Sequence, residues 1–224
     1  MMNGYHVDIV FCIDATGSMR HILDMVKTNA LNFYNDTIEC MKKKDKVVEK
    51  LRIRVIAFRD YNADGPNAML ATEFFDLPQD AKEFETLINT VQPMGGGDIP
   101  EDGLEALAFA MKSQWTEEGQ LRRHVIVVWS DAGTHELGFG KNAPNYPKKM
   151  AKDFGELTDW WGDSGQQGVM DRRAKRLLIF APDQNYWNAV SGTWDNVLHF
   201  PSEAGKGLAE LDYNVILDAI ANSI

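Results

Sequence analysis

The stretch from Val7 to Met19, VDIVFCIDATGSM, constrains the fold more than any other part of this chain. Its first half is short, rich in Val, Ile and Phe, and interrupted only by Asp8, as in a strand covered on both faces of a parallel sheet. Its second half places a carboxylate, two hydroxyls and a glycine within five residues. Apolar residues then recur at helical spacing to about Met41, which predicts one helix. We therefore expect these oxygens at the carboxyl end of a central strand, where open α/β sheets bind ligands.

Three side chains of this second half, Asp14, Thr16 and Ser18, alternate along the chain as D-x-T-x-S. Residues two apart in a tight loop can converge on one point, and a carboxylate with two hydroxyls provides hard oxygen ligands. Such ligands suit Mg²⁺, which prefers octahedral oxygen geometry and keeps several waters. The alternative is that Asp14 and Ser18 only cap the helix that follows. The pentapeptide alone does not choose between these interpretations.

The composition narrows the classes of partner. A net charge of −10 argues against a nucleic-acid backbone or an anionic membrane as the main partner, and it suits divalent cations. Two cysteines make no disulfide framework. The N-terminus lacks the pattern of a signal peptide, and no run of about 18 apolar residues could span a bilayer. We therefore expect a cytoplasmic protein.

Strand and helix patterns alternate along the rest of the chain. Strands are predicted at 51–58, 69–75, 124–129, 177–181 and 197–200, and helices at 78–91, 100–115, 154–161, 186–190 and 207–224. The turn at 62–67 has no helical pattern, so the strand after it is expected to pair antiparallel with the strand before it. The alternation predicts one α/β domain over residues 1–224, with a mostly parallel sheet and helices on both faces.

Two later aspartates also lie where the predicted sheet ends. Asp98 follows the three glycines at 95–97, and Asp131 follows the apolar strand at 124–129. Each has a structural explanation, because Asp98 with Glu101 fits a D-x-x-E variant of the capping box and Asp131 could close a turn. One metal site shared with Asp14 explains all of these positions together.

The segments DATGSM, GGGDIPEDGLEAL and VVWSDAGTH, in this order and spacing, resemble a von Willebrand factor type A (vWA) domain with its metal-ion-dependent adhesion site. With FRDYNADGP, they are most similar to the branch found in alpha-kinase-associated and hemicentin-type A domains. The resemblance covers essentially the whole chain. It implies a Rossmann-like, doubly wound sheet of about six strands, mostly parallel with one antiparallel edge strand. It also implies a divalent ion at the carboxyl-end crevice, and in some relatives a coupled shift of the C-terminal helix.

Carried over motif by motif, the resemblance implies five metal ligands: Asp14, Thr16, Ser18, Asp98 and Asp131. Thr16 replaces the usual serine and keeps the hydroxyl, whereas Asp98 stands where a threonine is common. Three carboxylates around one dication would give a net charge of −1, which attracts a partner's carboxylate less strongly. Asp98 would therefore bind either directly or through water. Mg²⁺ is the expected ion, with Mn²⁺ or Ca²⁺ as alternatives.

The segment 137–161 follows the last metal loop and is expected on the same rim of the molecule. Phe139 and Tyr146, together with Gly97 and His135, are the candidate partner-binding residues. Exposed aromatic side chains beside a metal make good interface anchors, and their replacement by alanine should weaken partner binding without lowering the melting temperature. The alternative is that aromatic residues of this segment pack a helix onto the sheet.

The resemblance favours a non-catalytic, metal-dependent protein-interaction module, which binds a protein on a separate chain through an acidic residue of that partner. One alternative is a Mg²⁺-dependent phosphohydrolase on the same site, for which His135 and Lys141 are the candidate helpers. The sequence contains neither a Walker-type phosphate loop nor a dinucleotide fingerprint. A second alternative is a metal-stabilised structural subunit of a larger assembly.

Overall fold

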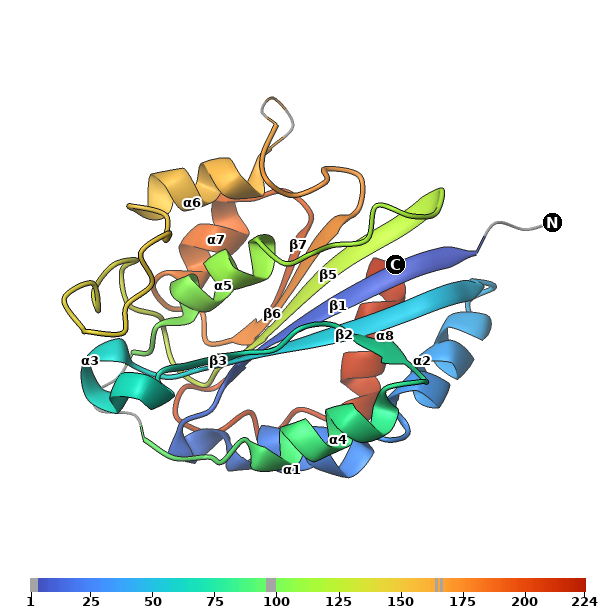
Figure 1. Ribbon diagram of the computed structural model, residues 1–224, viewed down its shortest axis with the longest axis horizontal. Helices are drawn as coiled ribbons and strands as arrows, with labels where there is room; N and C mark the ends of the chain where they lie inside the picture. The colour runs from blue at the N-terminus through green and yellow to red at the C-terminus, as the bar shows by residue number, and fades with distance from the viewer. Residues whose placement is uncertain (1–3, 96–99, 164, 166) are drawn as a thin grey trace.

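The computed structural model describes residues 4–95, 100–163, 165 and 167–224. Within these residues, seven strands form one sheet in the order β3-β2-β1-β5-β6-β7, and β4 also pairs with β2 (Figure 1). The strands are β1 (Tyr5–Asp14), β2 (Val48–Phe58), β3 (Met69–Ala71), β4 (Phe75–Leu77), β5 (Leu121–Trp129), β6 (Lys175–Ala181) and β7 (Val197–Pro201). The helices are α1 (Arg20–Asn29), α2 (Phe33–Lys42), α3 (Tyr61–Asp64), α4 (Ala81–Thr90), α5 (Gly103–Met111), α6 (Phe154–Trp161), α7 (Trp187–Thr193) and α8 (Tyr213–Ser223).

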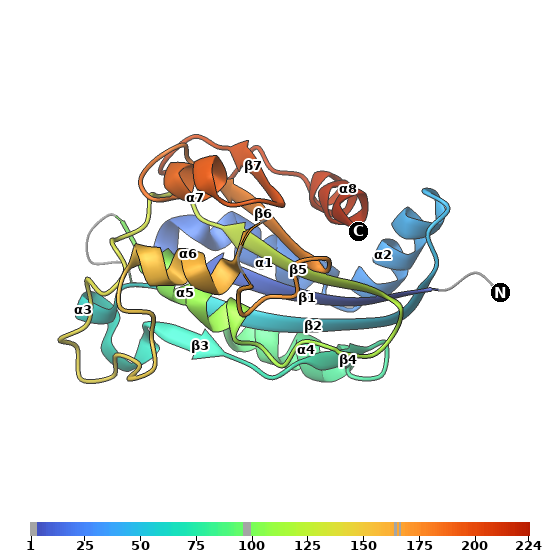
Figure 2. The same cartoon turned by 90° about the horizontal axis from the view of Figure 1, so that it is seen from above.

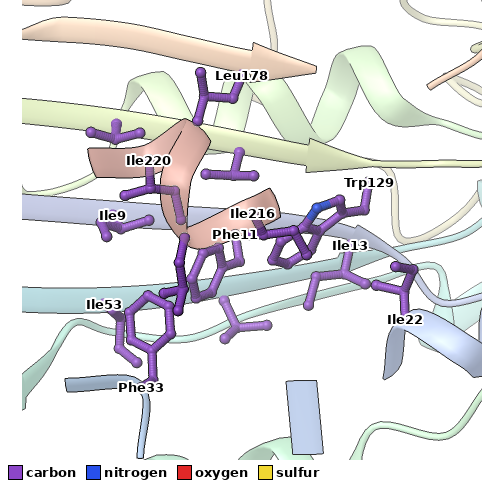
Figure 3. Packing of buried hydrophobic residues seen from close by; sticks show 14 of the residues in the cluster. Ile9, Phe11, Ile13, Ile22, Phe33, Ile53, Trp129, Leu178, Ile216 and Ile220 are labelled. Carbon is purple, nitrogen blue, oxygen red and sulfur yellow. The ribbon is translucent and has the colours of Figure 1, made fainter. Parts of the chain in front are cut away.

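The central strand β1 divides two hydrophobic cores, because successive side chains of a strand point to opposite faces. Ile9 and Phe11 belong to one core, which α1, α2, α4 and α8 cover (Figure 3). Val10 and Cys12 belong to the other core, under α5, α6 and α7. Figures 1 and 2 show these two sets of helices on opposite sides of the sheet. Burial on both faces explains why β1 is an almost unbroken apolar run.

The fold class predicted from the sequence is confirmed. The sheet is mostly parallel, its antiparallel strands lie at one edge, and helices flank both faces. The edge differs in one respect, because the strand predicted at 69–75 is two short strands, β3 and β4, both antiparallel to β2. Between them the hydroxyl of Thr72 accepts a hydrogen bond from the backbone N–H of Val55 (3.1 Å). A side-chain acceptor thus takes the place of a backbone carbonyl and interrupts the ladder.

Three helix predictions need correction. The single helix predicted to run to Met41 is two helices, α1 and α2, with a break between residues 30 and 32. The apolar period continues across the break because Ala30 and Phe33 are buried in the same core. The helix predicted from Pro100 begins at Gly103, and the last helix begins at Tyr213. Among the described residues, no helix is long and apolar enough to cross a membrane.

Candidate metal centre

The loops that follow β1 and β5 lie side by side at one edge of the sheet. The two strands are parallel neighbours in which Ile13 pairs with Trp129, so both chains leave the sheet at the same place. The hydroxyl of Ser130 donates a hydrogen bond to Oδ2 of Asp14 (2.9 Å). The hydroxyl of Ser18 donates to Oδ1 of Asp131 (3.0 Å). These two bonds join the loops across 116 and 113 residues of sequence.

The structure brings together four of the five predicted ligands. Asp14 ends β1, and its Oδ1 accepts hydrogen bonds from the backbone N–H (3.0 Å) and the hydroxyl (2.6 Å) of Thr16. The Thr16 and Ser18 hydroxyl oxygens are 3.4 Å apart. Neither η1 (Gly17–Met19) nor α1 has a side-chain hydrogen bond at its N-cap, so helix capping does not explain these residues. Asp98 and Gly97, the other predicted residues of this region, lie outside the described residues.

A pocket of about 350 Å³ opens at this cluster. It is lined by Thr16, Ser18, Glu101, Asp131, Ala132, Gln184, Ala204 and Gly205. Ser18 is exposed to solvent, whereas Asp14, Thr16 and Asp131 are buried. Thr16, Ser18, Glu101 and Asp131 therefore bring oxygens to a pocket that a ligand can reach from the surface, and Asp14 is bonded to Thr16 next to this lining.

Glu101 is a residue of this pocket that the sequence interpretation missed. In the sequence it fits a capping box with Asp98, but α5 begins two residues later and Glu101 bridges to Thr134. Its side chain is buried, and its Oε2 has no hydrogen-bond partner among the described residues. Residues 98–102 carry three acidic side chains, and no spacing rule indicates which of them faces the pocket.

Two of the buried carboxyl groups, those of Asp14 and Glu101, have pKa values above their usual range. Burial raises the pKa of Asp14 to about 6, although hydrogen bonds from Thr16 and Ser130 oppose the shift. Burial, followed by the negative charge of Asp14 and Asp60, raises the pKa of Glu101 to about 9. A divalent cation between such groups would favour their ionised forms. The donor set of carboxylates and hydroxyls, with the spare oxygen of Glu101, therefore fits an oxygen-preferring cation.

The segment before α8 is tied to the same site. The backbone N–H of Gly207 donates to Oδ2 of Asp131 (2.8 Å), and that of Gly205 donates to the Asp131 carbonyl (2.7 Å). Gly207 has φ of +59°, and a Cβ there would lie 2.2 Å from the carbonyl oxygen of Ser18. A glycine is required at this close approach.

The aromatic residues of 137–161 divide into exposed and packed groups. Phe139 is 50% exposed and stacks on His135, with ring centroids 3.9 Å apart. The Tyr146 hydroxyl donates to Oε1 of Glu105 (2.9 Å), and its ring packs against Tyr61. Trp161 is buried in the core under α6. Phe139 is therefore available at the surface, whereas Tyr146 is bonded into the structure.

A second group of potential ligands lies elsewhere in the fold. Asp60, Asp102 and His135 are all buried, and one ligand atom of each lies within 4.8 Å of the others. Such a group can hold a metal ion. His135 belongs to this cluster and does not line the pocket at Asp131.

A family model described as von Willebrand factor A domain matches residues 8–133. This match covers more than half of the chain, and the chain belongs to the vWA family. Domains of this family are typically adhesion or protein-interaction modules and are generally non-catalytic.

Known relatives are distant. Alpha-protein kinase vwkA of Dictyostelium discoideum is 23% identical over 141 residues, which are 63% of this chain and 21% of that protein. The chain thus matches about a fifth of the length of this curated relative. The pilus adhesin SpaC from Lactobacillus rhamnosus GG is similar in structure, with a TM-score of 0.53 and 10% identity over 99% of this chain and 31% of SpaC. The open conformation of SpaC gives a TM-score of 0.52 and 12% identity, over 99% of this chain and 30% of SpaC. These structural similarities concern the fold.

Proposed function

We propose that this chain is a non-catalytic module that binds a protein partner on a separate chain through a divalent ion at the carboxyl end of its sheet. One observation carries the proposal. Oxygens of Asp14, Thr16, Ser18 and Asp131 form a continuous chain of contacts at 2.6–3.4 Å, and Thr16, Ser18 and Asp131 line an open pocket. They come from two loops that the parallel sheet brings together.

In this proposal Asp14 and Asp131 provide negative charge, Thr16 and Ser18 provide neutral oxygens, and Glu101 provides a third carboxylate. Mg²⁺ suits this set best because all of its donors are oxygens, and Mn²⁺ accepts the same donors. The bound ion would supply the positive charge that draws an oxygen of the partner to the pocket. The protein holds the donors in place through hydrogen bonds between its own loops.

Three carboxylates around a dication leave a net charge of −1, so attraction of an acidic partner residue would be weakened. The rim must then contribute to recognition, and the half-exposed ring of Phe139 is suited to that role. His135 faces the second cluster and Lys141 is exposed, so neither candidate helper of a phosphohydrolase lines the pocket. This arrangement favours binding over catalysis.

The metal part of the proposal is tested by calorimetric titration of metal-stripped protein with Mg²⁺ and Mn²⁺. We expect one saturable Mg²⁺ site in the wild type, for which Mn²⁺ competes, and no Mg²⁺ site in Asp14→Ala or Asp131→Ala, because each loses a carboxylate ligand. Asp183→Ala, which removes an exposed carboxylate just beyond β6, is the matched control and should bind like the wild type. Absence of binding in the wild type would refute a metal-dependent function.

The interaction part needs a purified partner. Proteins retained by the immobilised chain in Mg²⁺ but not in EDTA would be purified and bound again to wild type and to Asp14→Ala. We expect binding that requires both the ion and Asp14. Equal binding in EDTA would refute a metal bridge. Metal-dependent hydrolysis of p-nitrophenyl phosphate that is lost in Asp14→Ala would favour the enzyme instead.

A further inference from the structure

The cluster of Asp60, Asp102 and His135 gathers side chains from three separate parts of the chain. Asp60 precedes α3, Asp102 precedes α5, and His135 lies in the loop after β5. Their exposed fractions are 1%, 0% and 6%, and one ligand atom of each lies within 4.8 Å of the others. The cluster is therefore buried, and none of its three residues lines the open pocket at Asp131.

Hydrogen bonds with the backbone hold the two carboxylates and the main chain of His135 in position. The N–H of Tyr61 donates to Oδ2 of Asp102 (2.6 Å), and the N–H of Asn62 donates to Oδ1 of Asp60 (2.7 Å). The backbone N–H of His135 donates to the carbonyl oxygen of Glu101 (2.9 Å). The geometry is fixed by the fold before any ligand arrives, which is a requirement of precise metal sites.

A further carboxylate, Glu105, gives a second and independent indication of a ligand. It lies one helical turn after Asp102 on α5 and is fully buried. Its Oε1 accepts hydrogen bonds from the Gly138 N–H (2.8 Å) and the Tyr146 hydroxyl (2.9 Å). Its Oε2 has no hydrogen-bond partner within the described part of the chain. Burial raises the pKa of Glu105, and the negative charge of nearby Asp60 adds to the shift.

Buried carboxylates are tolerated where they are paired or bound to a metal ion. A histidine nitrogen among carboxylate oxygens suits Zn²⁺ and other transition metals better than Mg²⁺, which prefers oxygen alone. We propose that Asp60, Asp102 and His135 form a second cation site that prefers a transition metal such as Zn²⁺, with the buried carboxylate of Glu105 one helical turn after Asp102.

An ion bound at this second site would stabilise the loops that carry its ligands, including the loop after β5 that also carries Asp131. The site joins the loop before α3, the start of α5 and the loop after β5. Phe139 stacks on His135, so an ion that fixes the imidazole also fixes the exposed ring on the rim. The ion would thus order the surface beside the pocket without lining the pocket itself. The proposal does not depend on Mg²⁺ binding at Asp14.

The test measures Zn²⁺ on purified, metal-stripped Asp14→Asn protein, in which the pocket site is impaired. We expect about one equivalent of tightly bound Zn²⁺ by elemental analysis after dialysis. Asp14→Asn/Asp102→Asn and Asp14→Asn/His135→Gln should bind at least about tenfold to a hundredfold more weakly, a loss that even supporting groups of metal sites produce. Asp14→Asn/Glu136→Gln, which changes an exposed neighbour of His135, is the control and should keep the ion.

Ring ¹⁵N resonances of His135 provide a readout in Asp14→Asn, where every proposed ligand is retained. Addition of Zn²⁺ should shift one ring nitrogen, whereas a hydrogen-bonded network without metal would show no shift. The proposal is overturned if folded Asp14→Asn binds no Zn²⁺, or if binding survives both second substitutions. Binding of Mg²⁺ as tightly as Zn²⁺ at this cluster would overturn the assigned preference.

Discussion

Two buried aspartates on the same strand, Asp8 and Asp14, have opposite surroundings. Asp8, toward the amino end of β1, accepts hydrogen bonds from Nε (2.8 Å) and Nη2 (2.6 Å) of Arg52 and from the Thr116 N–H (2.7 Å). Asp14, at the carboxyl end, accepts from Thr16 and Ser130, which are neutral, and lies near the acidic Asp131. Their exposed fractions are 1% and 0%.

The difference separates a structural carboxylate from one that is prepared for a ligand. A buried carboxylate that forms two bonds with a guanidinium is compensated within the chain. Among the described residues, Asp14 accepts hydrogen bonds from neutral donors only. The guanidinium of Arg59 is close enough to interact with its charge, but its Nε donates to the backbone carbonyl oxygen of Ala15 (3.0 Å). Both ends of β1 thus carry buried acid, but only Asp8 is bonded directly to a cationic side chain, so a bound cation would add to the compensation of Asp14. In open α/β sheets the carboxyl end is where ligands bind.

The largest change in stability is expected for a substitution of Asp8. Asp8→Asn removes the buried carboxylate of an ion pair whose Arg52 side chain is 17% exposed, and we expect a loss of about 3 kcal/mol in the free energy of unfolding. Urea denaturation measures it, with and without Mg²⁺. The double variant Asp8→Asn/Arg52→Met should recover part of this loss, because a methionine can still pack on Phe74, which lies 4.5 Å from the guanidinium carbon. Mg²⁺ affinity should be unchanged in both, since Asp8 lies far along β1 from the pocket.

The second prediction concerns Asp14→Asn without bound metal. This substitution should increase the free energy of unfolding at neutral pH, whereas Asp8→Asn lowers it. The folded protein raises the pKa of Asp14 from 3.8 to about 6, so between these values the native state binds more protons than the unfolded state. The contribution of Asp14 to stability therefore falls as pH rises from about 3.8 to about 6. The shift corresponds to about 3 kcal/mol at pH 7.5, from which about 1 kcal/mol is lost because the amide nitrogen of Asn cannot accept a hydrogen bond, so the metal-free variant should be more stable than the wild type by about 2 kcal/mol. The advantage should disappear near pH 4.

In saturating Mg²⁺ the wild type should be more stable than Asp14→Asn, because the ion stabilises the wild type and does not bind the variant tightly. Thermal unfolding at several pH values, with EDTA or Mg²⁺, measures both effects. If metal-free Asp14→Asn lost as much stability as Asp8→Asn, the two aspartates would be equivalent and the comparison would fail.

The parallel sheet and four residues of the candidate metal site can be predicted from local sequence patterns. The apolar run of β1 and the alternation of strands and helices predict a parallel sheet, since burial on both faces requires such runs. Asp14 and Asp131 could be placed together because the carboxyl ends of parallel strands share one edge. The oxygens of Thr16 and Ser18 then follow from their spacing to Asp14.

The remaining features depend on tertiary contacts. Glu101 faces the pocket because its backbone bridges to Thr134, a contact between segments 33 residues apart. His135 joins Asp60 and Asp102 because three loops meet, and no local spacing encodes that meeting. The break between α1 and α2 is likewise invisible in the apolar period, because both helices bury residues in one core.

The smallest effects are predicted for Tyr146 and Phe139, two aromatic residues of the loop after β5. Tyr146 is bonded within the protein and Phe139 is exposed, a contrast similar to that between Asp8 and Asp14. Tyr146 is internally bonded, so Tyr146→Phe should cost about 1 kcal/mol by leaving Glu105 with one hydrogen bond fewer. Phe139 is half exposed, so Phe139→Ala should change stability by less than about 0.5 kcal/mol. Urea denaturation measures both variants.

Partner binding should show the reverse order, because only the exposed ring can enter an interface without unfolding the loop. Affinity for the purified partner in Mg²⁺ should fall in Phe139→Ala by about tenfold, the effect of a single aromatic anchor. It should stay near the wild-type value in Tyr146→Phe, which keeps its ring. A large stability loss in Phe139→Ala would instead mean that its stacking on His135 belongs to the core, and the rim would then lack the anchor that a weakly electrophilic metal site requires.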